Sequence, residues 1–340
     1  MRIKGVLKSS VLRALTYLPY GITNKVIVAT ATRSVRARRR LGKMGLFDES
    51  LRRLGLNAAN DADEVLHTAV NRAMGWRISS LSRMRDRSFF SWCRIAGLDA
   101  LGSRGESGVV LVNSHYGAGR AVPLAIARAG FEIYSLEPED YLTAVGGQRP
   151  PHLHVISLRE GSAFWLRQLA QAKAVLKKGG IVHIAVDGLQ GKGGVERNFF
   201  GMKRVFQASF AQLAVQTGAK IVPVFATQHA DGRLFIECEA ALTTCDGTPS
   251  DARSQVEKLL DGYISVLTNR WRNAPAQILR KHLRYVAQGC APIDQGSTMP
   301  VRYESIDGYE SIRMEGVGRP VSETRSAVDM PSVRPGLESR

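Results

Sequence analysis

Short apolar runs recur through the middle of the chain, and polar or glycine-rich turns separate them. Runs bounded in this way are typical of buried strands, and they predict six strands, at residues 108–113, 131–136, 153–158, 181–186, 220–226 and 233–240. Segments with apolar residues at helical spacing predict helices at residues 121–129, 162–177, 206–217, 248–271 and 275–287. This alternation predicts an α/β fold with a central, mostly parallel mixed sheet flanked by helices.

The regions outside this pattern divide the chain into three parts. Residues 1–53 are predicted to form a basic, partly helical arm, because they hold 13 Lys and Arg residues against 2 acidic residues. The α/β domain is assigned to residues 54–287, and its first part, residues 61–100, shows helical patterns. Residues 288–340 are rich in Gly, Pro, Ser and mixed charge, which predicts a largely disordered tail.

The basic arm suggests what the protein contacts. Over residues 6–18, apolar residues at helical spacing lie beside cations, as in a helix that lies in a membrane interface. The alternative is a helix packed on the domain with solvated arginines. We expect an anionic membrane surface as the partner rather than nucleic acid, because the arm holds few aromatic residues that would stack on bases. No apolar run is long enough to span a bilayer, so a peripheral, monotopic attachment is expected.

Several kinds of site are disfavoured. The four cysteines show no spacing typical of metal ligands, which predicts a reduced compartment and no metal. The glycine-rich loop at 188–194 does not follow the dinucleotide-binding pattern, and no Walker-type sequence follows it. A Gly-x-Ser-x-Gly nucleophile motif is absent, which disfavours serine hydrolase chemistry.

His115 is the first candidate for chemistry. It follows the apolar run Val109–Val112 and precedes Gly117 and Gly119, so it is predicted at the carboxyl end of a strand, at a strand-to-helix turn. Open α/β sheets bind their ligands at that edge. A neutral imidazole accepts a proton near pH 7, which makes His115 a candidate general base. The alternative is a histidine that only completes the hydrogen bonding of the strand end.

A second block adds context. The run 181–186 ends in Asp187, and the glycine-rich loop follows it. Next come the four residues Asn198, Phe199, Phe200 and Gly201, then a helical pattern, then Gly-Ala-Lys-Ile-Val-Pro-Val-Phe at 218–225.

This order resembles the lysophospholipid acyltransferase superfamily, and within it the bacterial lipid A biosynthesis lauroyl/myristoyl acyltransferases. The resemblance spans roughly residues 10–285 and includes the segment Pro275-Ala276-Gln277 before the last helix. It implies an O-acyltransferase that moves a fatty acyl group from acyl carrier protein or acyl-CoA to a hydroxyl of a lipid or glycolipid. It implies no cofactor beyond the acyl thioester co-substrate, and a location at the cytoplasmic face of the bacterial inner membrane.

The sequence departs from the family at the site. The family pattern is His-x4-Asp/Glu, with the acid orienting the imidazole, but Arg120 stands in the acid's place. A guanidinium has no acceptor for an imidazole N–H. Three explanations stay open: an acid from elsewhere, namely Asp187, Glu137 or Asp140, takes the role; a backbone carbonyl orients His115; or the protein binds lipid without transferring an acyl group. The usual tryptophan after Pro-x-Gln is also replaced, by Ile278.

The resemblance assigns roles to residues of both blocks. His115 and Asp187 are the catalytic candidates. The candidates for binding substrate are Arg120, Arg197, Asn198, Phe199, Phe200, Gly201 and Lys203. Arginine pairs bidentately with phosphate, which suits a phosphorylated acceptor, and the two phenylalanines are candidates for the entrance of an acyl chain. The alternatives are a solvated surface loop for the charges and plain core for the aromatic rings.

Overall fold

The computed structural model describes residues 19–42, 45–57, 60–72, 74–102, 107–137, 141–144, 146–157, 162–186, 194–242 and 251–287. The predicted interfacial helix at 6–18 and the predicted tail at 288–340 lie outside these residues. The description below concerns the unit Met1–Arg302.

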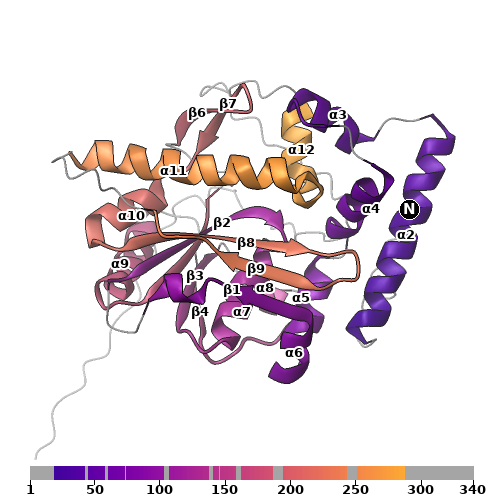
Figure 1. Ribbon diagram of the computed structural model, residues 1–340. Coiled ribbons are helices and arrows are strands. Elements are labelled where there is room, and N and C mark those ends of the chain that lie inside the picture. The colour runs from indigo at the N-terminus through magenta and orange to yellow at the C-terminus, as the bar shows by residue number, and fades with distance from the viewer. Residues whose placement is uncertain are drawn as a thin grey trace, which may run out of the picture. The chain divides into compact units, whose positions relative to one another are not determined.

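A sheet with strand order β1-β9-β8-β2-β5-β3-β4 forms the centre of this unit (Figure 1). Its strands are β1 (Cys93–Ala96), β2 (Val109–Gly117), β3 (Ile133–Glu137), β4 (Leu153–Ser157), β5 (Ile181–Ala185), β8 (Lys220–Gln228) and β9 (Leu234–Cys238). The strands from β8 to β4 are mutually parallel, whereas β9 pairs antiparallel with β8 and β1 runs parallel to β9. The predicted mostly parallel mixed sheet is therefore confirmed.

Helices cover both faces of the sheet (Figure 1). One layer consists of α3 (Leu46–Arg53), α9 (Ser162–Lys177), α10 (Ser209–Thr217), α11 (Ala252–Asn273) and α12 (Arg280–Ala287). The other consists of α5 (Met74–Ser82), α6 (Asp86–Trp92), α7 (Val122–Arg128) and α8 (Tyr141–Ala144), with the 3₁₀ helix η1 (Leu98–Leu101). Alternate residues of β2 supply the two cores: Val110 and Val112 pack with the first layer, Val109 and Leu111 with the second. Such a strand, buried on both faces, gives the continuous apolar run seen in the sequence.

The predicted elements agree with the structure in type, with three corrections. Residues 93–96, inside the predicted helical region, form β1. This strand has only four residues, which is too short to show a recognisable alternation of apolar and polar positions. The segment 195–206 contains the hairpin β6 (Val195–Phe199) and β7 (Met202–Phe206), so the helix predicted from 206 begins at Ser209. The helix predicted over 275–287 is divided, because Ile278 pairs with the backbone of Tyr116 between η3 (Pro275–Gln277) and α12.

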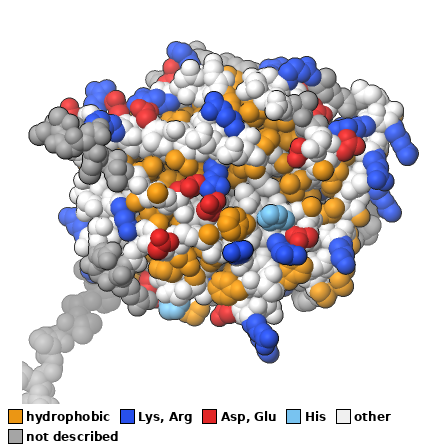
Figure 2. All heavy atoms as spheres, viewed as in Figure 1, with side chains coloured by type: hydrophobic (Ala, Val, Ile, Leu, Met, Phe, Trp, Pro, Cys, Tyr) orange, Lys and Arg blue, Asp and Glu red, His pale blue; other side chains and the backbone are white. Residues whose placement is uncertain are grey.

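Helix α2 (Tyr20–Arg40) lies beside α4 (Asp61–Val70) and buries Ile27 and Ala31 against it. Its exposed residues include the cations Lys25, Arg33, Arg36 and Arg40. Figure 2 shows Lys and Arg side chains along the side of the molecule where α2 lies in Figure 1. Exposed Ile22 and Val26 lie on the same helix. In the described part of the chain, no helix combines the length and apolar character needed to cross a membrane.

Candidate active site

The site is built around the carboxyl end of β2. In the sheet β2 lies between β5 and β8 and is parallel to both. The chain leaves β2 toward β3 on the β5 side and returns later to β8 on the other side. The strand order therefore reverses at β2. Open α/β sheets usually bind their ligands in the crevice at such a topological switch point. His115 lies at this point, as the sequence predicted, and the structure shows that it is half-buried.

The turn that follows His115 is held from two sides. The Asn113 side chain reaches across it, and its Nδ2 donates to the carbonyl oxygen of Gly119 at 2.9 Å. On the other side, the Ala118 N–H donates to the carbonyl oxygen of Ala226 on β8 at 2.8 Å. Gly117 between them has φ +52°, and a Cβ there would overlap the same Ala226 oxygen. Only glycine combines this left-handed backbone with so close an approach.

The Pro-x-Gln segment is hydrogen-bonded to the end of β8, the strand next to β2. Gln277 is buried, and its Nε2 donates to the carbonyl oxygen of Gln228 at 2.9 Å. The Gln228 N–H donates back to Gln277 Oε1 at 3.0 Å. Arg77, also buried, donates from Nη1 to Gln228 Oε1 at 2.9 Å. One amide thus satisfies both backbone groups at the end of β8, beside the His115 turn.

Replacing Gln277 by leucine is expected to lower the free energy of unfolding by about 2–4 kcal/mol, because both backbone groups of Gln228 lose their partner in a buried position. Urea unfolding measures the change. The control is Gln216→Leu on the exposed side of α10, expected to change stability by no more than about 0.5 kcal/mol. Equal losses in the two variants would contradict this role for Gln277.

A second histidine packs near His115. The ring of His282, on α12, has its centroid 5.8 Å from that of His115 and is fully buried. Arg204 Nη2 lies 3.0 Å from His282 Nδ1. Because a guanidinium only donates, Nδ1 is the acceptor, and the proton of a neutral His282 is on Nε2. Arg204 is itself buried, with its Cζ 5.0–5.4 Å from the ring centroids of Phe199, Phe206 and Trp271.

Arg120 occupies the position where the sequence pattern expected an acid. It lies in the short 3₁₀ helix η2 (Gly119–Ala121) and is exposed. Its guanidinium carbon lies 3.8 Å from the ring centroid of Tyr141, so the side chain stacks on α8. This position leaves it accessible to an anionic ligand. Asp187, the second catalytic candidate, Asp140, and the glycine-rich loop at 188–193 lie outside the described residues.

The four-residue segment Asn198–Gly201 forms the end of the β6–β7 hairpin. Phe200 has φ +55° and Gly201 φ +75°, which is the pattern of a two-residue type I′ turn. Phe199 is buried in the core. Phe200 is half-buried and stacks on Trp271, with ring centroids 6.0 Å apart. An aromatic residue in the left-handed region is unusual, and the packing of its ring supports it there.

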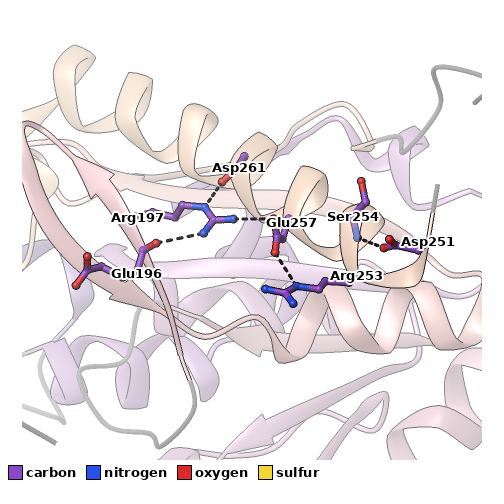
Figure 3. Close-up of polar contacts among 7 residues, drawn as sticks. All are labelled: Glu196, Arg197, Asp251, Arg253, Ser254, Glu257 and Asp261. Atoms are coloured by element: carbon purple, nitrogen blue, oxygen red, sulfur yellow. Dashed lines mark hydrogen bonds and ion pairs between the residues drawn. The ribbon is translucent and has the colours of Figure 1, made fainter.

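Two of the three cations of the hairpin, Arg197 and Lys203, have carboxylate partners. Figure 3 shows those of Arg197. Arg197 Nε donates to Asp261 Oδ1 at 2.7 Å, and its Nη2 lies 3.7 Å from Glu257 Oε2; both acids lie on α11. Lys203 Nζ lies 3.0 Å from Glu196 Oε1 and is largely exposed. Asn198, opposite Lys203 in the hairpin, is exposed. A phosphate that bound Arg197 would therefore share it with these acids or displace them.

The comparison with protein families decides the identity of the chain. The family model described as bacterial lipid A biosynthesis acyltransferase matches residues 63–277, more than half of the chain. The chain belongs to this family. No curated protein matches the chain in the comparison made with it.

The lipid A biosynthesis acyltransferase family consists of lipid acyltransferases. Its reaction needs a lipid acceptor and an acyl thioester donor. The matched segment includes His115, the hairpin and Gln277, and it ends before α12. His282 therefore comes from outside the matched residues.

Sequence reasoning did not find His282, which packs near His115, or Arg204, which contacts His282. Neither residue was singled out in the sequence, and His282 only fell within the last predicted helix. No spacing along the chain links them to His115, since they lie 167 and 89 positions away. Only the packing of α12 and the hairpin against the sheet edge brings Arg204 and His282 together.

Proposed function

We propose that this protein is a membrane-associated O-acyltransferase. It would move a fatty acyl group from acyl carrier protein or CoA to a hydroxyl of a lipid or glycolipid acceptor. The observation that carries the proposal is the position of His115 at the carboxyl end of β2, in a chain that belongs to a lipid acyltransferase family.

In the proposed reaction His115 acts as the general base. The imidazole takes the proton of the acceptor hydroxyl while the hydroxyl oxygen attacks the carbonyl carbon of the thioester. The tetrahedral intermediate collapses, the C–S bond breaks, and the thiolate takes the proton back from the imidazolium. No covalent enzyme intermediate is needed. Backbone N–H groups of the 188–194 loop, or Arg197, are our candidates for stabilising the oxyanion, and Asp187 remains our candidate for orienting His115.

Membrane association is supported by the exposed side of α2. Ile22 and Val26 are 50% and 40% exposed there, in the same helix as the cations Arg33, Arg36 and Arg40. An apolar cavity of about 870 Å³ lies beside this end of α2, between the helix, α6 and the turn that joins β8 to β9. Apolar side chains next to cations suit the interface of an anionic membrane.

Arg120 supports a second candidate function, a lipid-binding relative that does not transfer acyl groups. A guanidinium has no acceptor for an imidazole N–H, so Arg120 cannot play the part of the family's acid. Incubating the protein with labelled acyl carrier protein or acyl-CoA and a total bacterial lipid extract separates the two candidates. Label in a lipid ester supports acyl transfer, and the labelled product identifies the acceptor and the preferred donor. Acyl binding without an ester product supports the second candidate.

Phe200 tests the predicted acyl-chain entrance separately from folding. Asn-Gly is the preferred pair in a type I′ turn, so Phe200→Asn relieves backbone strain while it removes the ring contact with Trp271. We expect unfolding free energy within about 1 kcal/mol of the wild type. If the ring lines the acyl path, the KM for long-chain thioesters rises about 10-fold, which corresponds to a loss of about 1.4 kcal/mol of apolar binding free energy. The KM for short-chain thioesters stays the same. An equal change for both donors would contradict the assignment.

A further inference from the structure

The apolar cavity beside α2 lies at the same edge of the sheet as His115. Strand β8 is parallel to β2, so the turn that joins β8 to β9 is at the carboxyl edge of both strands. The start of α2 packs on this turn (Figure 1), and the Tyr20 hydroxyl donates to the carbonyl oxygen of Gly232 at 2.9 Å. The cavity is bounded by α2, α6 and the turn. A ligand in it therefore lies at the edge where the proposed reaction takes place.

The walls of the cavity are largely apolar. Tyr20 and Trp92 meet edge to face, with ring centroids 5.0 Å apart, and Met84 and Val28 add partly buried apolar surface. The hydroxyl of Tyr20 is already bonded to Gly232. The volume of about 870 Å³ is in the usual range of ligand pockets, about 300–1,000 Å³. Such walls offer a ligand apolar contact and few hydrogen-bond partners, which suits a hydrocarbon chain.

The rim of the cavity combines exposed apolar surface with positive charge. Ile22 in the lining is 50% exposed, and Val26, one turn farther along α2, is 40% exposed. Lys25 also lines the cavity; it is exposed and has no carboxylate partner in the part of the chain that the structure describes. The charge of Asp231 in the lining is largely cancelled by Arg233, whose Nε lies 2.9 Å from Asp231 Oδ2. This rim suits a ligand with an apolar chain and an anionic head group.

We propose that the cavity holds one acyl chain of an anionic membrane phospholipid, with the phosphate at Lys25. The proposal rests on the membrane association proposed above and specifies the lipid contact behind it. Ile22 and Val26 enter the bilayer interface beside the bound chain, and the exposed arginines farther along α2 add attraction to an anionic surface. The bound lipid holds the carboxyl edge of the sheet against the membrane, so that a lipid acceptor reaches His115 from the bilayer.

Photolabelling of the full-length protein on vesicles tests the occupant directly. The vesicles contain phosphatidylcholine and a phosphatidylglycerol with a photoreactive diazirine in one acyl chain, and mass spectrometry of the digested protein identifies the labelled residues. We expect label on Met84 and Trp92, which line the cavity and are only partly exposed. A helix that only lies on the bilayer would carry label on Ile22 and Val26 alone, and that result would overturn the proposal.

A second probe identifies the source of the chain. Palmitoyl-CoA with the same diazirine carries the hydrocarbon of an acyl donor instead of a phospholipid. In the presence of phosphatidylglycerol vesicles, we expect it to label Met84 and Trp92 much less than the phospholipid probe does. Equal or stronger labelling by the thioester would assign the cavity to the acyl donor and reject the phospholipid.

A soluble probe measures the contribution of Lys25 without a membrane surface. Binding of lysophosphatidylglycerol is measured below the concentration at which it forms micelles. Lys25→Gln is expected to weaken it about 2- to 5-fold, the usual contribution of an exposed ion pair. Arg36→Gln is the matched control, because Arg36 is exposed on the same helix but does not line the cavity. Its affinity should be that of the wild type, and an equal loss in both variants would argue against a phosphate at Lys25.

Two tryptophan variants separate the cavity from general membrane contact. Ala29 lines the cavity, whereas Ala37 is exposed about two turns later on α2 and does not. An indole at either position adds apolar surface for a bilayer. Only Ala29→Trp is expected to lower the label on Met84 and Trp92, about 10-fold, because its ring takes space from the acyl chain. The same yield of label in both variants would be evidence against a chain in the cavity.

These measurements also distinguish failure of this proposal from failure of the proposed function. A wild-type protein that does not bind the vesicles rejects membrane association, and the lysophosphatidylglycerol affinities still decide whether the cavity takes an acyl chain. Transferase activity is measured separately and does not enter either result.

Discussion

Replacing His115 by alanine is expected to lower the turnover number for acyl transfer by about 10²–10⁴-fold, the usual contribution of a general base. The acceptor hydroxyl would have to lose its proton to water instead. Because His115 is only half-buried at the end of β2, the melting temperature should change little. Initial rates with a labelled thioester and an excess of lipid acceptor measure the effect.

The control for this variant is His229→Ala. His229 is exposed in the turn after β8, the neighbouring strand, and no role is assigned to it. Its replacement should leave the turnover number unchanged. A His115→Ala protein that keeps the wild-type rate would show that the imidazole is not the base.

Gly117→Ala is expected to lower the free energy of unfolding by about 2–5 kcal/mol. About 1–2 kcal/mol comes from an alanine in the left-handed region, and the rest from the overlap of its Cβ with the Ala226 carbonyl. Relief of this overlap would move the His115 turn away from β8, so any folded protein should also lose activity. Urea unfolding and the transferase assay measure the two effects.

Gly218→Ala is the matched control for Gly117→Ala. Gly218 ends α10 with φ +70°, and a Cβ there would meet no atom within 4 Å. This variant has the cost of the left-handed backbone alone, about 1–2 kcal/mol. If the two variants lost the same stability, the close approach of the turn to β8 would be contradicted.

Much of the fold follows from local pattern. The central strands β2, β5 and β8 were detectable because each is an apolar run buried on both faces of the sheet. The β6–β7 hairpin was missed because its outward residues are polar and its turn contains Phe200, whose left-handed backbone depends on packing against Trp271. Tertiary contact, rather than turn propensity, supports that turn.

The site was predictable only in part. A strand ending in a histidine and a glycine turn placed His115 correctly, because the carboxyl edge of a parallel sheet is set by topology. The surroundings of His115 come from other strands and helices, and only packing brings them there. Arg197 is an example: its acidic partners Glu257 and Asp261 are 60 or more positions away, and their pairing needed the placement of α11 over the hairpin.

The most direct test of the central claim is a single-turnover experiment. Wild-type protein in excess over a labelled acyl thioester, with the lipid acceptor identified from the extract, is quenched over time, and the label in lipid ester is measured. We predict that the label passes from the thioester to the lipid, with no label on the protein after denaturation, and that His115→Ala leaves it in the thioester. Label that stays in thioester bound to the wild-type protein would contradict acyl transfer at this site.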